Sequence, residues 1–272
     1  MTVMEGTAPT RIHPTAVIDP SAEIGPGCDV GPYAVVRAGV QMGANCRIGA
    51  WSSVGPWVRL GRDNTVYDHA AVGGDPQDKS WRGEPTWLVL GDGNQVREFA
   101  TLNRGTSKGD GVTRIGNRNL FMACSHVAHD CTVGDGCVFA NNVLLAGHVF
   151  VEDGAILNGA AGVQQFTTVG RLAYVGGLTR IVHDVPPYMI VEGNPAKVRK
   201  PNVVGMQRAG VPEERIAAVR EAHRMLFRSK RPQSEVLDEL VGRADASPET
   251  LELVAFLRRV EKGANGRARE KK

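Results

Sequence analysis

The sequence predicts a mainly β fold, in which short strands wind into a triangular coil, followed by a small helical domain. Three observations support this prediction. An apolar residue recurs at every sixth position, small residues stand at fixed offsets from it, and glycine is abundant, with 33 in 272 residues. A helix requires a period of 3.6 residues and a simple strand a period of two, so a period of six indicates the hexapeptide repeat.

The apolar period runs in three stretches. Its members are Ile12, Ile18, Ile24, Val30, Val36, Met42, Ile48, Val54, Leu60, Val66 and Val72, then Leu90, Val96 and Leu102, and then, shifted by one residue, Ile115, Phe121, Val127, Val133, Phe139, Leu145, Val151, Leu157, Val163, Val169, Val175 and Ile181. Each should point into the coil, and the small residue that follows permits a tight corner. Three hexads make one coil, so residues 18 apart should stack about 4.8 Å from each other.

Composition excludes several classes of protein. The net charge of +3 is too small to indicate nucleic-acid binding, and no apolar run approaches the length of about 18 residues that a membrane span requires. Residues 1–10 lack the features of a signal peptide, and we expect them to be disordered. Four of the five cysteines, Cys28, Cys46, Cys131 and Cys137, fall on small inward positions. We therefore expect reduced thiols and a cytoplasmic protein, although a Cys28–Cys46 disulfide remains open.

The coil should span residues 11–188, with loops at 73–87 and 103–114 where the period is interrupted. Long loops that leave a regular solenoid usually carry function. A helical domain should follow at 189–261. Its first helix should start near Pro212, where a proline and acidic residues are typical of a helix start and the apolar residues that follow fall on one face. Two more helices should lie near 233–242 and 247–260, and the second of these has the same start signals. The charged tail, 262–272, should be disordered.

One ladder of stacked residues suggests chemistry. His129 is the third residue of its hexad, and Gly147 and Gln165 follow it at intervals of 18. An imidazole, an unobstructed glycine N–H and a side-chain amide should therefore share one groove. Asp130 is placed to orient the His129 ring, an arrangement used for general-base catalysis, and the Gly147 N–H can stabilise an oxyanion. The pattern indicates acyl transfer to a hydroxyl.

Two other interpretations of these histidines stay open. His126, His129 and His148 together could bind zinc between subunits, as in a zinc-dependent hydratase on the same coil. Alternatively, they are ordinary surface histidines on a scaffold without activity. His69 and His183 receive a structural interpretation.

Beyond these patterns, the sequence resembles the UDP-N-acetylglucosamine O-acyltransferases that begin lipid A synthesis. The matching stretches are GRDN (61–64), PQD (76–78), GEPT (83–86), NRGT (103–106), HVAHDCTVGD (126–135), NNVLLAGHV (141–149), QFTTVG (165–170) and DVPPY (184–188). The resemblance implies a left-handed parallel β-helix with a small α-helical C-terminal domain. It also implies a homotrimer with active sites in the grooves between subunits, and no metal or organic cofactor.

The resemblance further implies transfer of an R-3-hydroxyacyl chain from acyl carrier protein to the 3-hydroxyl of a UDP-sugar. In that case His129 removes the hydroxyl proton, Asp130 supports it, and the Gly147 N–H receives the oxyanion. The positions matching substrate-binding residues are Gln77, Asp78, His126, His148, Gln165, Asn202 and Arg208. Gly177 matches a position that limits acyl length, and the acidic carrier protein would dock on arginines such as Arg171, Arg199, Arg208, Arg215 and Arg220.

Several positions depart from the family pattern, namely Gln164, Ser80, Val204 and Ala209. They affect sugar and nucleotide contacts and leave the proton-transfer residues intact. A UDP-3-amino sugar, which would give an amide product, is therefore an alternative acceptor.

Overall fold

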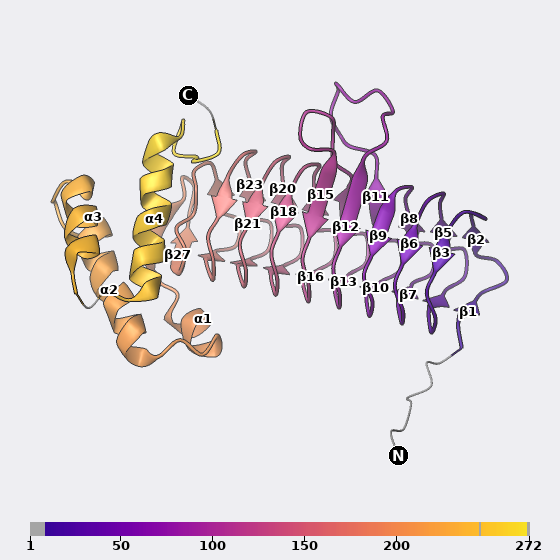
Figure 1. The fold of residues 1–272 in the computed structure, drawn as a ribbon, viewed down its shortest axis with the longest axis horizontal. Coiled ribbons are helices and arrows are strands. Elements are labelled where there is room, and N and C mark those ends of the chain that lie inside the picture. Colours follow the sequence, from indigo (N-terminus) through magenta and orange to yellow (C-terminus); the bar gives the residue numbers. More distant parts are fainter. Residues whose placement is uncertain (1–8, 245, 271–272) are drawn as a thin grey trace, which may run out of the picture.

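The computed structural model describes residues 9–244 and 246–270. In them the chain forms a left-handed parallel β-helix, which is a prism of three sheets, and a C-terminal helical domain caps one end of it (Figure 1). The fold class predicted from the period of six is confirmed. Residues 1–8, most of the N-terminal segment expected to be disordered, lie outside the described residues.

Each sheet takes at most one strand from each coil, and sheet A also contains the antiparallel strand β28 of the terminal hairpin. Sheet A contains β1 (Arg11–Ile12), β4 (Asp29–Val30), β7 (Arg47–Ile48), β10 (Thr65–Val66), β13 (Gln95–Val96), β16 (Leu120–Phe121), β19 (Val138–Phe139), β22 (Ile156–Leu157), β25 (Tyr174–Val175), β27 (Met189–Glu192) and β28 (Lys197–Pro201). Sheet B contains β2 (Val17–Ile18), β5 (Val35–Val36), β8 (Ser53–Val54), β11 (Ala71–Gly74), β14 (Thr101–Asn103), β17 (His126–Val127), β20 (Leu144–Leu145), β23 (Gly162–Val163) and β26 (Arg180–Ile181). Sheet C contains β3 (Glu23–Ile24), β6 (Gln41–Met42), β9 (Val58–Leu60), β12 (Trp87–Leu90), β15 (Val112–Ile115), β18 (Thr132–Val133), β21 (Phe150–Val151) and β24 (Thr168–Val169).

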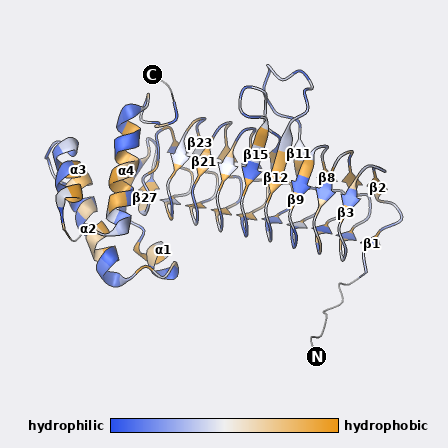
Figure 2. Cartoon of the chain, in the orientation of Figure 1, coloured by the Kyte–Doolittle hydropathy of each residue, from blue (hydrophilic) through white to orange (hydrophobic). Residues whose placement is uncertain are grey.

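The strand register confirms the predicted stacking. Gly162 pairs with both Leu144 and Arg180, its neighbours 18 residues away on either side. The apolar residue of each hexad is buried from Val30 onward, whereas Ile12 is 47% exposed because the first coil is covered on one side only. The thiols are free, and Cys28 and Cys46 each donate to a carbonyl of the next coil. Hydrophobic and hydrophilic segments alternate around each coil, and the projecting loops are largely hydrophilic (Figure 2).

The two loops project from one corner of the prism, where the chain passes from sheet B to sheet C (Figure 1). They span residues 75–86 and 104–111 and are therefore shorter than the predicted 73–87 and 103–114. The reason is that the two loops leave from successive coils, so the strands at their bases continue to pair. Trp87–Leu90 pairs with Val112–Ile115 over its full length.

The C-terminal domain begins with an antiparallel hairpin, β27–β28, rather than with helices, so the prediction of a helical domain over 189–261 is corrected at its start. The helices that follow are α1 (Val203–Arg208), α2 (Glu213–Phe227), α3 (Gln233–Gly242) and α4 (Pro248–Lys262). The Ser247 hydroxyl accepts from the Thr250 N–H and caps α4. Apolar residues of α1–α4 bury one another and also cover Tyr188 and Met189 at the end of the prism. Among the described residues, no helix combines the length and apolar character that a bilayer crossing demands.

The tail is not disordered where the structure describes it, which corrects the prediction for residues 262–272 up to Glu270. After α4 the chain turns back onto the prism, and its backbone exchanges hydrogen bonds with Asp184: Asp184 N–H donates to Gly266 O and Ala268 N–H donates to the Asp184 carboxylate. The charge of the tail suggested disorder, but its arginines and amides find acceptors on the last coils.

Candidate active site

The predicted ladder lies on the corner between sheets B and C, the same corner from which both loops project. His148 N–H donates to His129 O at 3.0 Å, so Gly147 and its neighbour lie one coil above His129. A Cβ atom built on Gly147 would lie 2.5 Å from His129 Cε1, a distance too short for non-bonded atoms. A larger residue there would therefore displace the His129 imidazole, which covers that position. Within the described residues, the Gly147 N–H donates to no acceptor.

Asp130 holds the imidazole of His129. His129 Nδ1 lies 2.7 Å from Asp130 Oδ2. The second loop satisfies the rest of the carboxylate: the Thr106 hydroxyl donates to Oδ2 at 2.6 Å and the Thr106 N–H to Oδ1 at 2.8 Å. Burial acts to raise the pKa of Asp130, but the hydrogen bonds from His129 and Thr106 outweigh it, and the net pKa is lowered. The carboxylate is thus ionised and leaves His129 Nε2 free to act as a base.

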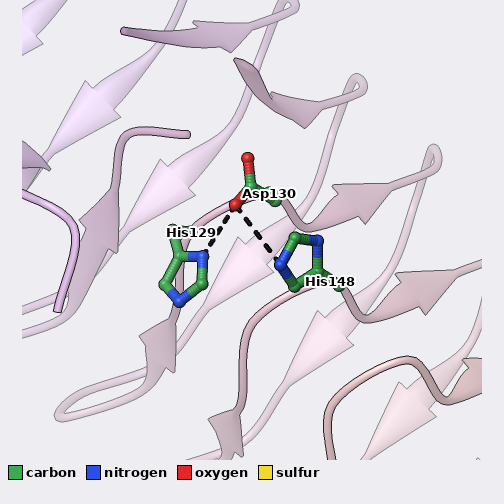
Figure 3. Close-up of side chains that lie close together, drawn as sticks. All are labelled: His129, Asp130 and His148. Carbon is green, nitrogen blue, oxygen red and sulfur yellow. Dashed lines mark hydrogen bonds and ion pairs between the residues drawn. The ribbon is translucent and has the colours of Figure 1, made fainter. Parts of the chain in front are cut away.

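His148 stands on the other side of the same carboxylate, with Nε2 at 3.6 Å from Asp130 Oδ2 (Figure 3). Its ring meets His129 edge-on at 5.3 Å and stacks on Phe166 at 4.8 Å. Burial lowers the pKa of His148, Asp130 opposes this effect, and the net pKa is lowered. His148 is therefore neutral at neutral pH, so it competes little with His129 for Asp130.

A groove of about 580 Å³ opens beside these residues. Its walls come from the corner, from sheet B and from the first loop, and its lining residues are Gln77, His126, Ala128, His129, Leu144, Leu145, Ala146, Gly147, Gly162, Val163, Gln164, Gln165, Arg180, Ile181 and Val182. Five predicted site residues, Gln77, His126, His129, Gly147 and Gln165, thus line one groove. His126 Nδ1 lies 2.7 Å from the Thr101 hydroxyl, and burial followed by the neighbouring His129 lowers the pKa of His126.

Asp78, predicted to bind the sugar, connects the two loops. Its carboxylate accepts from the Ser80 N–H at 2.7 Å and from the Ser80 hydroxyl at 2.8 Å, and it pairs with Lys108 of the second loop at 3.2 Å. The Ser80 hydrogen bonds, followed by Lys108, lower the pKa of Asp78. The departure at Ser80 therefore has a structural consequence, because serine fixes the conformation of Asp78.

Asp78, Asp130 and His148 each adjoin a lining residue of this groove in the chain, whereas the other three predicted residues lie away from it. Asn202 and Arg208 line a second groove of about 690 Å³ against sheet A, together with Val204 and Ala209. The Asn202 side chain caps α1 by accepting from the Gly205 N–H, and it donates to Leu172 O. Gly177 is exposed and lines neither groove.

The residues that could bind zinc in the structure differ from the predicted set. The ligand atoms of His129, Asp130 and His148 lie within 4.8 Å of one another, whereas His126 is not in this group. Asp130 Oδ2 is already engaged by His129 Nδ1 and the Thr106 hydroxyl. A cation would have to displace the His129–Asp130 hydrogen bond, so these residues fit proton transfer better than metal binding.

Sequence reasoning missed Thr106, Thr113 and Arg180. The Thr113 hydroxyl accepts from the Asp130 N–H at 2.8 Å, and Arg180 lines the groove. One signal was available for the first of these, because the NRGT stretch that contains Thr106 begins the second loop. Arg180 lies 18 residues after Gly162 on the outer face of sheet B, and stacking alone would have placed it there.

The comparisons with known proteins agree with this geometry. Residues 184–265 match the family model "Udp N-acetylglucosamine O-acyltransferase; Domain 2", and residues 112–147 match a model of bacterial transferase hexapeptide repeats. The chain is 52% identical over 240 residues to an acyl-[acyl-carrier-protein]–UDP-N-acetylglucosamine O-acyltransferase of Gloeothece citriformis, covering 88% of this chain and 87% of that one. A Synechocystis protein of the same name is 45% identical, with 74% and 72% covered.

Solved structures give the same result. A UDP-N-acetylglucosamine acyltransferase from Bacteroides fragilis has a TM-score of 0.88 at 35% identity, with 91% of this chain and 96% of that chain covered. The Moraxella catarrhalis O-acyltransferase has a TM-score of 0.86 at 42% identity, with 90% and 95% covered.

Proposed function

Because the chain belongs to the family of acyl-[acyl-carrier-protein]–UDP-N-acetylglucosamine O-acyltransferases, we propose that it transfers an R-3-hydroxyacyl chain from acyl carrier protein to the 3-hydroxyl of UDP-N-acetylglucosamine. This is the first step of lipid A synthesis. The observation that carries the proposal is the His129–Asp130 pair, whose imidazole lies over the bare backbone of Gly147 in a groove.

In this mechanism His129 Nε2 takes the proton of the sugar 3-hydroxyl, and the oxygen attacks the thioester carbonyl. Asp130 stabilises the imidazolium that forms, through its 2.7 Å contact with Nδ1. The Gly147 N–H donates to the tetrahedral oxyanion, which is the charge that develops in the transition state. The intermediate then expels the thiolate of the carrier's prosthetic group, and the proton on His129 passes to that sulfur.

The predicted substrate-binding residues lie on two separate grooves of one chain. This separation supports an active site that is shared between neighbouring subunits of a homotrimer. Gln77, Asp78, His126, His148 and Gln165 surround the catalytic groove, and we assign them to the sugar and the start of the acyl chain. Arg208 lies on the other groove, on α1, which Asn202 caps, and we assign these two to the nucleotide and its phosphates. A second copy of the chain would bring the two grooves together. Gly177, which is exposed, then limits the acyl chain.

The carrier protein is acidic, so we place its docking on the exposed arginines Arg171, Arg199 and Arg208. Two further candidates, Arg215 and Arg220, already pair with Glu249 and Glu213. A cytoplasmic location is our expectation, because the free thiols fit a reducing compartment. No observation favours the 3-amino acceptor or a zinc-dependent hydratase.

The proposal is tested by incubating the protein with 3-hydroxyacyl carrier proteins of several chain lengths and with UDP-N-acetylglucosamine, its 3-amino analogue or its 3-deoxy analogue. Mass spectrometry should show one acyl chain added to UDP-N-acetylglucosamine and none to the 3-deoxy sugar. Absence of product with every carrier protein, or acylation of the 3-deoxy sugar, would end the proposal. Size measurement in solution should give three chains per particle.

A further inference from the structure

The corner that carries the catalytic residues continues beyond Gln165 to His183, which is the next position in the ladder because Gly162 pairs with Arg180. The C-terminal segment, residues 264–270, is attached at this rung. His183 Nδ1 lies 2.7 Å from Asn265 O, and a Cβ atom on Gly266 would lie 2.7 Å from the same ring nitrogen. The tail thus packs directly on the end of the active-site corner.

Further contacts hold the segment in place. The Asp184 carboxylate accepts from the Thr168 N–H and from the Ala268 N–H, each at 2.7 Å, and so joins the prism to the tail. Arg267 is 6% exposed, and its guanidinium donates to Val182 O at 2.5 Å. Because these partners are on the last two coils, they fix the position of Arg269, which follows directly in the chain.

From this anchor, Arg269 reaches back to the catalytic coil. Its Nη1 donates to His148 O at 2.7 Å, and its guanidinium lies over the Phe150 ring at 4.2 Å. The carbonyl that it binds belongs to the residue that follows Gly147 in the chain. His148 has a φ of 61°, the left-handed conformation that recurs at corner residues of this coil, as in Trp57, Asp130 and Phe166.

The contact matters because of what His148 faces. Its Nε2 lies 3.6 Å from Asp130 Oδ2, the oxygen that supports His129. The charged groups that act on His148 are Asp130, His129, Arg269 and Asp78, and Arg269 is among those that lower the pKa of His148. A protonated His148 would draw the carboxylate away from His129.

We propose that Arg269 is a positioning residue of this active site: through the His148 carbonyl and the Phe150 ring it fixes the corner after Gly147 and reserves Asp130 for His129. The inference rests on the proposed acyl transfer. It makes the C-terminal segment part of the catalytic apparatus, although Arg269 itself touches neither His129 nor Asp130 in the contacts described.

The test compares Arg269→Met, Arg269→Lys and a control, Arg258→Met, which removes a half-exposed α4 arginine paired with Asp238. We expect Arg269→Met to lower kcat about fivefold, the scale of one exposed charge-assisted hydrogen bond, with KM values and the thermal midpoint close to those of the wild type. Lysine should restore part of kcat, and the control should change nothing. In ¹³C-histidine NMR, the His148 titration should move to higher pH in Arg269→Met.

Unchanged kcat together with an unchanged His148 titration would overturn the proposal. A fall in kcat that accompanies a lower unfolding midpoint, with no movement of that titration, would also overturn it, because the tail would then be merely structural. Failure of the proposed function has a different signature: the wild type itself would transfer no acyl chain, and the NMR titration would still decide the role of Arg269.

Discussion

The corner between sheets B and C is built in the same way in the first coils and in the catalytic coils, yet only the latter carry chemistry. In the first coils the two corner positions are held by Pro20–Ser21, Ala38–Gly39 and Pro56–Trp57, and in the later coils by His129–Asp130, Gly147–His148 and Gln165–Phe166. The backbone is alike after the first coil, since the second corner residue has a φ of 54° in Trp57, 59° in Asp130 and 61° in His148, whereas Ser21 does not adopt a positive φ.

This difference in corner residues indicates that the fold and the activity depend on separate positions of the hexad. Inward aliphatic residues and small neighbours determine the coil, and they recur in both regions. The outward corner residues contribute little to the core and are free to vary. A catalytic corner then needs two further groups besides its histidine. One is a carboxylate beside the imidazole, and the other is a loop residue, Thr106, that hydrogen-bonds to the carboxylate.

The largest loss of activity is expected for His129→Ala. Its kcat should fall about 10³-fold, because the general base is lost. The matched control is Ala38→His, which places a histidine at the corresponding corner position of an early coil. It should leave the rate unchanged and should not restore activity to His129→Ala. The measurement is product formation by mass spectrometry, with circular dichroism to confirm folding. A rate of His129→Ala near that of the wild type would contradict the assignment.

Asp130→Asn should lower kcat by about 10²-fold, because the neutral amide no longer stabilises the His129 imidazolium. Steady-state kinetics should show most of the loss in kcat and little in KM. If KM rose and kcat were unaffected, Asp130 would have a role in binding rather than in proton transfer.

Gly147→Ala should also reduce kcat, by roughly 10- to 100-fold, because the added methyl displaces the His129 ring, whose Cε1 would lie 2.5 Å away. Gly242→Ala is the control, since a Cβ there meets nothing within 4 Å. Equal rates for the two variants would show that the ring has room to move without loss of activity.

A smaller effect is expected from Gly177→Leu, which should shift the preferred acyl chain to a shorter one by about tenfold in relative kcat/KM. Competition between carrier proteins loaded with long and short chains measures this ratio. A ratio equal to that of the wild type would remove Gly177 from the acyl site.

The smallest effect concerns stability against pH. The pKa of Asp130 is lowered by folding, so its contribution is present above the unfolded-state pKa and is lost as the pH falls through the folded pKa. The pKa of Asp184 is raised by burial and acts in the opposite sense. The difference in unfolding free energy between the wild type and Asp130→Asn should therefore shrink on acidification below about pH 4. A difference that stays constant with pH would contradict this linkage.

Much of the fold and part of the site were predictable, because a strict period converts sequence distance into spatial distance. The ladder of His129, Gly147 and Gln165, the buried cysteines and the helices near 213–227, 233–242 and 248–262 follow from local patterns. The hairpin after residue 188 was missed, because its two strands have no hexad period.

Contacts made outside the period do not follow from the stacking of residues 18 apart. Thr106 reaches Asp130 from a loop without repeat, and Arg269 reaches His148 from a charged tail whose composition indicated disorder. His183, for which the sequence favours a structural interpretation, continues the ladder and anchors that tail. Such contacts depend on tertiary packing, which a one-dimensional pattern does not contain.

A crystal structure with the acylated UDP-sugar bound would show whether His129 and Gly147 act as proposed, because it locates both reacting oxygens. We predict the ester oxygen on the sugar within about 3 Å of His129 Nε2 and the ester carbonyl oxygen within about 3 Å of the Gly147 N–H. Product bound on another edge of the prism, with both atoms beyond hydrogen-bonding reach, would contradict the account.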